Sequence, residues 1–77
     1  MNTTRRKELD RALAMLEEAR SIIDNVKDEE QSAMDNMPES LQEGLQGEKM
    51  QECISAMEDI DSSLDEAIGR IDEAKGT

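Results

Sequence analysis

The chain has 77 residues, and its 20 Asp and Glu against nine Lys and Arg give it a net charge of −11 at neutral pH. It contains no His, Phe, Tyr or Trp, which removes imidazole acid–base chemistry, the commonest metal ligand and aromatic stacking on bases. Most enzyme classes are therefore disfavoured. Direct binding to nucleic acid or to an anionic membrane is disfavoured too, because the acidic field instead attracts basic surfaces.

The length corresponds to one small domain, residues 1–77, near the size at which a single core contributes only roughly 3–5 kcal/mol. Cys53 is the only cysteine, so no intrachain disulfide can form, and we interpret it as a small core residue in a reducing compartment. No apolar run approaches the ~20 residues of a membrane span. The basic residues 5–7 are followed by acid rather than by the apolar region of a signal peptide, and we expect a cytoplasmic protein.

The first predicted element is a helix over about residues 4–36. This stretch has no Gly or Pro and is rich in Glu, Arg, Leu, Ala and Met, which are good helix formers. Asn2, Thr3 or Thr4 can cap its start. The helix must end before Pro38, whose ring disfavours the helical conformation of the preceding residue.

A linker over residues 37–47 follows, with a possible short helical turn that opens at Pro38 and ends at Gly44. Leu41 and Leu45 are four residues apart, and we expect them to cap the end of the core. Together these features predict a compact turn between two long helices.

The second long helix is expected over about residues 48–75, after a flexible point at Gly47 and before Gly76. Both helices carry residues at the 3,4 spacing of a heptad seam, the line that faces a partner helix in a coiled coil. On the second helix the seam is Met50, Cys53, Met57, Ile60, Leu64, Ala67, Ile71 and Ala74. On the first it is Leu9, Ala12, Leu16, Ala19, Ile23, Val26, Glu30, Ala33 and Met37.

The two seams match in register when the second helix folds back antiparallel to the first. Large pairs then alternate with layers that are mostly small, which lets the helices approach closely. We predict an all-α fold, a coiled-coil-like antiparallel two-helix hairpin. The facing pairs are Ala12 with Ala74, Leu16 with Ile71, Ala19 with Ala67, Ile23 with Leu64, Val26 with Ile60, Glu30 with Met57, Ala33 with Cys53, and Met37 with Met50.

Further apolar residues flank the seams and widen the apolar stripe beyond a two-helix contact. A homodimer of two hairpins, forming a four-helix bundle, would bury them. The docking orientation of the two hairpins stays open. The predicted dimer face consists of Leu13, Met15, Ile22, Met34, Ile54 and Ile68.

The acids of the second helix fall in two lines that each repeat every seven residues, about 10.5 Å along a helix. They are Glu52, Glu58, Asp59, Asp65, Glu66, Asp72 and Glu73. Such a face can be a solvated surface that only keeps the protein soluble. It can also bind a basic partner or mimic phosphates, which is favoured because only Lys49, Arg70 and Lys75 interrupt it.

No catalytic, cofactor-binding or metal-ligating residue is assigned. Residues 59–63 resemble the start of an EF-hand loop, but Leu64 stands where that loop needs Gly and Arg70 where it needs the bidentate Glu. Carboxylates at consecutive positions, such as Glu17 and Glu18, lie about 100° apart on a helix. They do not form the convergent pair that acid–base catalysis needs, and we expect a protein that is not an enzyme.

Three phrases in the chain carry a resemblance to a known group of proteins: DEEQ at residues 28–31, DNMPESLQ at residues 35–42, and a GE-x-M helix start at residues 47–50. Together with the acidic heptads, they resemble a family of short acidic proteins of bacterial genomes and prophages. The chain departs from that pattern at Gly44-Leu45-Gln46, where a more polar stretch is expected. The resemblance implies a helical hairpin from a mobile element, with no assigned activity or substrate.

Two functions follow as hypotheses. In the first, a non-catalytic acidic protein of phage or prophage origin binds a basic surface of a host nucleic-acid-handling or defence protein, as an inhibitor or nucleic-acid mimic. It would act in the cytoplasm of a bacterial or infected bacterial cell. In the second, the chain is a structural helical assembly module whose acidity only provides solubility. Neither requires a cofactor, direct contact with nucleic acid or a membrane.

Overall fold

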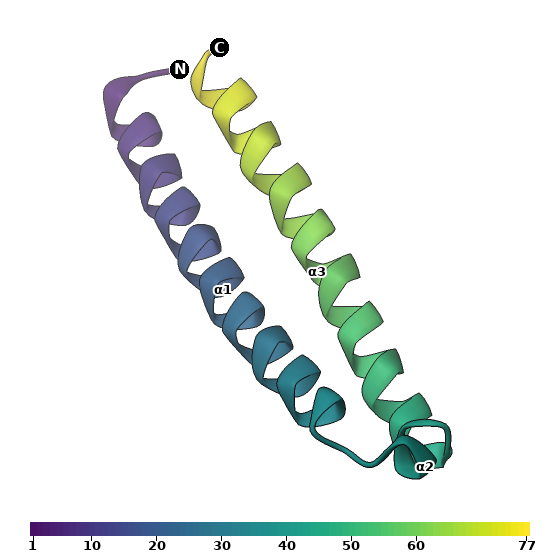
Figure 1. Ribbon diagram of the computed structural model, residues 1–77. Helices are drawn as coiled ribbons and strands as arrows, with labels where there is room; N and C mark the ends of the chain where they lie inside the picture. The colour runs from purple at the N-terminus through teal and green to yellow at the C-terminus, as the bar shows by residue number, and fades with distance from the viewer.

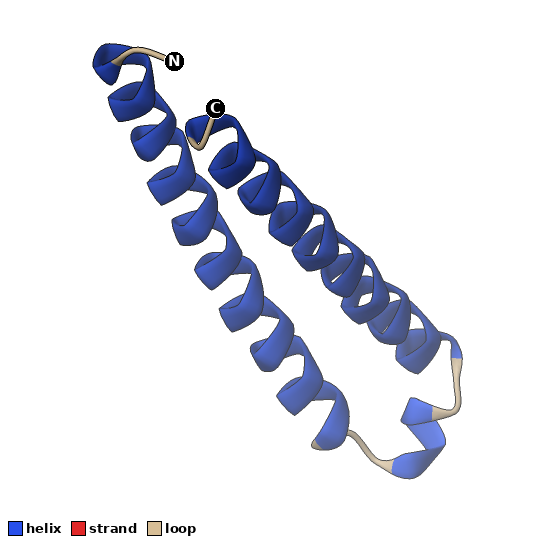
Figure 2. Cartoon of the chain, turned by 90° about the horizontal axis from the view of Figure 1, so that it is seen from above, coloured by secondary structure: helices blue, strands red, loops and turns tan.

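The computed structural model describes all 77 residues and contains three helices and no strand: α1 (Thr3–Asp35), α2 (Glu39–Gln42) and α3 (Leu45–Lys75). The prediction of an all-α protein is confirmed. Figure 1 shows α1 and α3 side by side and running in opposite directions, with α2 at the turn and both chain ends at the other end. The view from above agrees (Figure 2), and the molecule is a thin rod of 58 × 14 × 12 Å.

The ends of α1 follow from local chemistry. Asn2 caps the start, because its Oδ1 accepts a hydrogen bond of 2.8 Å from the backbone N–H of Arg5. At the other end, Asn36 donates its backbone N–H to the Ser32 carbonyl. Pro38 then takes an extended conformation, with ψ of 145°, and leads into α2. The helix therefore covers Thr3–Asp35 where the sequence predicted about residues 4–36.

The turn is tighter than expected, because α3 begins at Leu45 and already includes Gly47 in its first turn. Gly47 is buried, and a Cβ there would overlap the backbone of Gln42 at the end of α2. The expectation that Gly47 is a flexible point before the helix is wrong, since the position needs glycine for close approach. The expectation that Leu41 and Leu45 cap the core is also wrong, because they are 47% and 67% exposed.

The contact between α1 and α3 keeps most of the predicted seam. The small residues Ala12 and Ala19 of α1, and Ala67 and Ala74 of α3, are half-buried as expected. The residues at the alternate layers are half-buried on both helices, as expected for facing positions: Leu9, Leu16, Ile23, Glu30 and Met37 on α1, and Met50, Met57, Leu64 and Ile71 on α3. These residues mark the interior of the helix pair.

The remaining four seam positions, all in the half of the rod nearer the turn, are rotated away from the partner helix. Val26, Ala33, Cys53 and Ile60 were predicted to face the partner helix, but all four are exposed. The residue that follows each of them is more buried and takes its place, so the interpretation of Cys53 as a core residue is wrong. The four replacements are Lys27, Met34, Ile54 and Asp61.

Side-chain size explains this rotation, because it exchanges small apolar residues for larger ones. At the loop end Ile54 replaces Cys53 and Met34 replaces Ala33 in the interior. Each added buried methylene contributes about 0.8 kcal/mol. The layer of Val26 and Ile60 is the exception, because there the rotation replaces two apolar residues in the interior with the charged Lys27 and Asp61.

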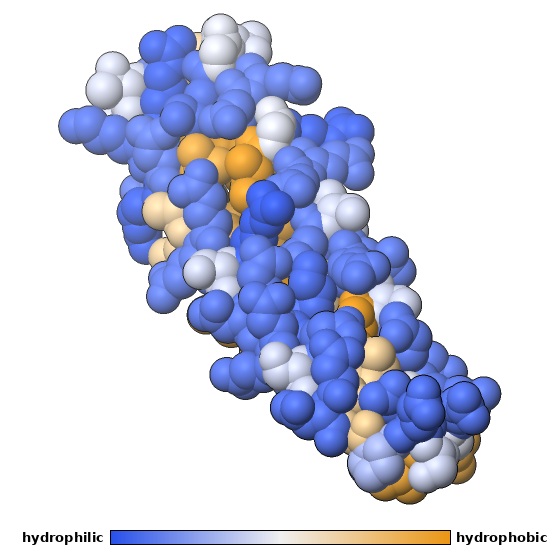
Figure 3. Space-filling view, viewed as in Figure 1, coloured by the Kyte–Doolittle hydropathy of each residue, from blue (hydrophilic) through white to orange (hydrophobic).

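A two-helix rod nevertheless buries little. Ile54, 2% exposed, is the only buried residue with a large apolar side chain. Figure 3 shows one face of the molecule, where hydrophilic residues cover most of the surface and hydrophobic residues gather between the two long helices and at the α2 end. Most apolar side chains are therefore only partly removed from water.

Candidate functional site

One side of the helix pair, the polar side, is closed by ion pairs between α1 and α3. Arg20 pairs with Asp65, and Lys75 pairs with Asp10 nearer the chain ends. Between the Arg20 layer and the turn, Lys27 Nζ lies 3.5 Å from Asp61 Oδ2. These three ion pairs link α1 and α3 at three positions along the rod, and they fix how each helix is rotated about its own axis.

Asp61 and Asp24 form a carboxyl pair on this side. Asp61 is 8% exposed, and its Oδ1 has no hydrogen-bond donor. A hydrogen bond that Asp24 can donate to Asp61 once it is protonated raises the pKa of Asp24 and lowers the pKa of Asp61. Asp24 therefore takes up a proton first, and in that form it supplies the donor that Asp61 lacks.

The chain ends are also held together. The hydrogen bond to Asp10 raises the pKa of Lys75 above its usual 10.5. The amino group of Met1 lies 3.4 Å from the carbonyl oxygen of Thr77. Both termini therefore lie together at the open end of the rod.

The seven predicted acidic residues are all exposed on α3. Two of them are paired with cations, Asp65 with Arg20 and Glu66 with Arg70 at 3.1 Å. The others make no ion pair: Glu52, Glu58, Asp59, Asp72 and Glu73. These five form the unpaired acidic set.

The sequence predicted that the two adjacent acidic lines form one acidic face, but the face is not continuous. Ser55, Ser62 and Gly69 are seven residues apart and lie between the lines on the helix circumference. A Cβ on Gly69 would meet nothing within 4 Å, so the surface there is open. The outer side of α3 is a strip of small residues between two rows of carboxylates.

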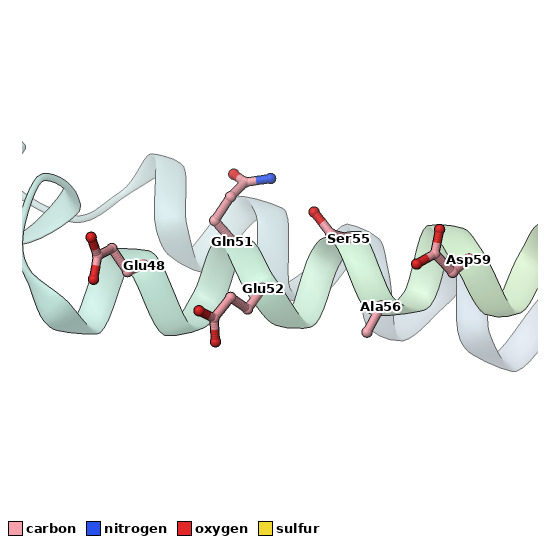
Figure 4. A pocket seen from close by; sticks show the side chains of 6 residues that line it. All are labelled: Glu48, Gln51, Glu52, Ser55, Ala56 and Asp59. Carbon is pink, nitrogen blue, oxygen red and sulfur yellow. The ribbon is translucent and has the colours of Figure 1, made fainter.

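The one pocket of the molecule lies at the loop end of this strip (Figure 4). It is an open depression lined by Glu48, Gln51, Glu52, Ser55, Ala56 and Asp59, all from α3. Figure 4 shows that these side chains fan outward from one helix and do not converge. This shape suits contact with a protein surface better than enclosure of a small molecule.

The predicted dimer face is not a single surface. Leu13, Met34 and Ile68 are half-buried between the helices towards the polar side. Ile54 cannot belong to a dimer face in this fold, because it is packed inside the pair. Only Met15 and Ile22 are largely exposed, at 58% and 54%, and they lie on the opposite side from the ion pairs.

Sequence reasoning missed two residues of that opposite side, Val26 and Ile60, which are 44% and 42% exposed. Helical geometry places them with Met15 and Ile22 on one surface, because the ion pairs fix which flank of α1 meets which flank of α3. We call it the apolar face. Its exposed residues are Glu8, Met15, Ile22, Val26, Glu29 and Ala33 of α1, and Lys49, Cys53, Ala56, Ile60, Ser63 and Arg70 of α3. The half-buried Ala12, Ala19, Ala67 and Ala74 lie along its middle, beside the seam.

No group of three or more His, Cys, Asp or Glu side chains is arranged to hold a metal ion. In the segment that resembles an EF-hand start, Asp61 is buried against α1 whereas Asp59 is exposed on the outer side of α3. No helix offers a stretch of the length and apolarity needed to cross a membrane. Comparison with protein-family models, curated proteins and solved structures finds no match to this chain.

Proposed function

We propose that this chain is a non-catalytic interaction protein that binds a basic surface of another protein through the outer side of α3. The observation that carries the proposal is the unpaired acidic set, five exposed carboxylates with no cation partner in the chain. A basic partner can approach them without breaking an internal ion pair. Complementary charge then speeds association and selects the partner.

The shape of the surface supports the same proposal. Ser55, Ser62 and Gly69 leave room between the carboxylate rows for long side chains such as Lys and Arg. Arg can form paired hydrogen bonds with a carboxylate on either row. The expected partner surface is therefore a ridge or helix that presents basic side chains.

Charge density favours contact with a limited basic patch over replacement of a nucleic-acid duplex. The net charge of −11 spread over 58 Å is about one charge per 5 Å, whereas duplex DNA carries one per ~1.7 Å. Of the two modes considered, inhibition by occupying a patch needs less charge than mimicry of the whole duplex. We propose the former.

The resemblance to short acidic proteins of bacterial genomes and prophages supports a bacterial setting for this interaction. We propose a phage or prophage origin and action in the cytoplasm of the host cell. The partner class is then a host nucleic-acid-handling or defence protein, because such proteins carry basic surfaces for nucleic acid.

The test is affinity capture from a bacterial lysate over a salt series, followed by mass spectrometry. A partner bound through the carboxylates on the outer side of α3 should be lost as salt is raised. It should also be lost with the triple variant Glu52→Gln/Asp59→Asn/Glu73→Gln. The matched control is Glu17→Gln/Glu18→Gln/Asp28→Asn, which removes the same charge from exposed positions of α1. Equal loss of the partner with both variants would show that only net charge matters and would contradict a specific strip.

A second candidate function, a structural helical assembly module, is favoured by a different observation. The chain buries only one large apolar side chain, and small scaffolds with so little core usually need a partner. In this proposal two antiparallel helical hairpins associate into a four-helix bundle, and the acids only keep the assembly soluble. Strong self-association with no captured basic partner would favour it over the first.

A further inference from the structure

We infer that the apolar face binds a second copy of this chain, and that the two copies dock end for end, with the chain ends of one beside the α2 turn of the other. This inference rests on the self-association just proposed and specifies its surface and orientation. It does not depend on a basic partner, because the unpaired acidic set lies on a different side of α3.

The composition of the apolar face identifies its occupant. The face has two acids, Glu8 and Glu29, and two cations, Lys49 and Arg70, so it is neutral in a molecule of net charge −11. A basic partner gains little there, since the acids lie elsewhere. A second copy can approach through this face without placing acidic rows in contact.

The exposed area also fits a dimer. A compact monomer of 8.6 kDa is expected to expose roughly 4,700 Å², whereas this chain exposes 5587 Å². The excess, roughly 900 Å², is close to the ~800 Å² that each partner contributes to a standard interface. Contact along most of the rod is therefore sufficient for a stable pair.

The side chains on the face suit helix packing. Met15, Ile22, Val26 and Ile60 supply exposed apolar groups of substantial size. The alanines between them, such as Ala19, let helices from two copies approach closely. In an end-for-end dimer the symmetry axis crosses the rods, so α1 packs on α1 of the partner and α3 on α3.

Charge along the rod selects the orientation. The open end, residues 1–11 and 70–77, has six cations and four acids, a net charge of +2. The remainder, residues 12–69, has three cations and 16 acids, a net charge of −13. End-for-end docking sets the basic end of each copy beside the acidic turn of the other, whereas same-direction docking sets like beside like.

The first experiment measures mass by sedimentation equilibrium at micromolar concentration. The expected mass is about 17 kDa, twice 8.6 kDa. The variant Val26→Glu/Ile60→Glu should fall to the monomer mass. The control Ala14→Glu/Ser62→Glu adds the same charge at exposed positions outside the apolar face and should stay dimeric.

Circular dichroism checks that the variants keep their helices. If Val26→Glu/Ile60→Glu loses its helical signal, Met15→Gln/Ile22→Gln replaces it, because these two side chains are the more exposed. A wild-type monomer at all concentrations would overturn the inference together with self-association. A dimer that survives either helical face variant would overturn the choice of surface alone.

The second experiment measures the distance between spin labels attached at Glu43→Cys in a Cys53→Ser background. Residue 43 lies at the turn, so end-for-end docking separates the two labels by nearly the 58 Å length of the rod. Same-direction docking brings them within roughly 30 Å, a few interhelix spacings. The short distance in a confirmed dimer would overturn the orientation and leave the surface intact.

Discussion

Lys27 of α1 and Asp61 of α3 meet across the helix pair, with Nζ 3.5 Å from Oδ2, at the layer where Val26 and Ile60 were expected to face each other. Removing the Lys27 charge leaves the buried Asp61 carboxylate without its cation, which costs more than the pair itself contributes. Lys27→Met should therefore lower the Tm, and Lys27→Met/Asp61→Leu should regain most of the loss. Additive effects of Lys27→Met and Asp61→Leu in a double-mutant cycle would show that the two residues do not interact.

Mild acid should stabilise the protein through the carboxyl pair. The hydrogen bond to Asp61 raises the pKa of Asp24, so the folded state binds this proton more tightly than the unfolded chain does. Its contribution to the Tm should rise as the pH falls from neutral through the folded pKa of Asp24. Below the usual aspartate value of 3.8 the contribution of Asp61, whose pKa is lowered, should be lost as its carboxylate is protonated.

A matched pair of variants isolates this contribution from that of the other acids. Asp24→Asn places a permanent amide donor beside Asp61, so it should raise the Tm at neutral pH and flatten its rise on mild acidification. Asp28→Asn makes the same charge change at an exposed position of α1 that has no ion pair, and it should leave the rise in place. Parallel pH profiles for wild type and Asp24→Asn would contradict the assignment.

Alkaline pH should loosen the open end of the rod. The hydrogen bond to Asp10 raises the pKa of Lys75, so its stabilising contribution is complete below 10.5 and is lost as the pH rises through the folded pKa. Amide exchange near the chain ends should therefore accelerate in that range relative to the middle of α3. Lys75→Gln should show the faster exchange already at neutral pH, once intrinsic exchange rates are corrected for pH.

Two glycines of α3 should respond in opposite ways to alanine. Gly47→Ala forces a Cβ into the backbone of Gln42, and overpacking of this kind costs about 1–3 kcal/mol. Gly69→Ala meets open space and should gain about 0.8–1 kcal/mol from helix propensity. Urea denaturation measures both, and a destabilised Gly69→Ala would show that this stretch is not a solvent-facing helix.

A comparison of two isoleucines tests the rotation of the helices. Ile54→Ala removes the one large apolar side chain buried in the chain and should cost about 2–5 kcal/mol. Ile60→Ala acts at a position 42% exposed and should cost less than about 1 kcal/mol in the monomer. The urea midpoint at a concentration below dimerisation separates them, and similar losses would restore the seam predicted from the heptads.

Three of the four ends of the long helices, and the helix period, were predictable because they depend on local signals. The cap at Asn2, the break at Pro38 and the end before Gly76 all depend on nearby backbone. Gly47 was misread because glycine signals either flexibility or close approach, and only the position of Gln42 decides between them. A local rule cannot supply that position.

The rotation of the seam was not predictable from spacing, because neighbouring heptad lines fit the period equally well. Seven residues after Cys53 comes the apolar Ile60, and seven residues after Ile54 comes Asp61, which pairs with Lys27. Both lines therefore offer residues that can face α1. The larger interior gained with Ile54, and the ion pair of Lys27 with Asp61, decide between the lines. A comparison of side-chain volume between adjacent lines was the available signal, and it would also have exposed Val26 and Ile60.

Because both termini lie together at one end, a force applied between them would act across the rod rather than along it. The helices would then separate from the open end, and the contacts between them would break one after another. They would not slide past each other with the force shared among all contacts. The Lys75–Asp10 pair would break first, followed by Arg20–Asp65 and then Lys27–Asp61 near the turn. Any tether attached to the two ends would thus meet little mechanical resistance.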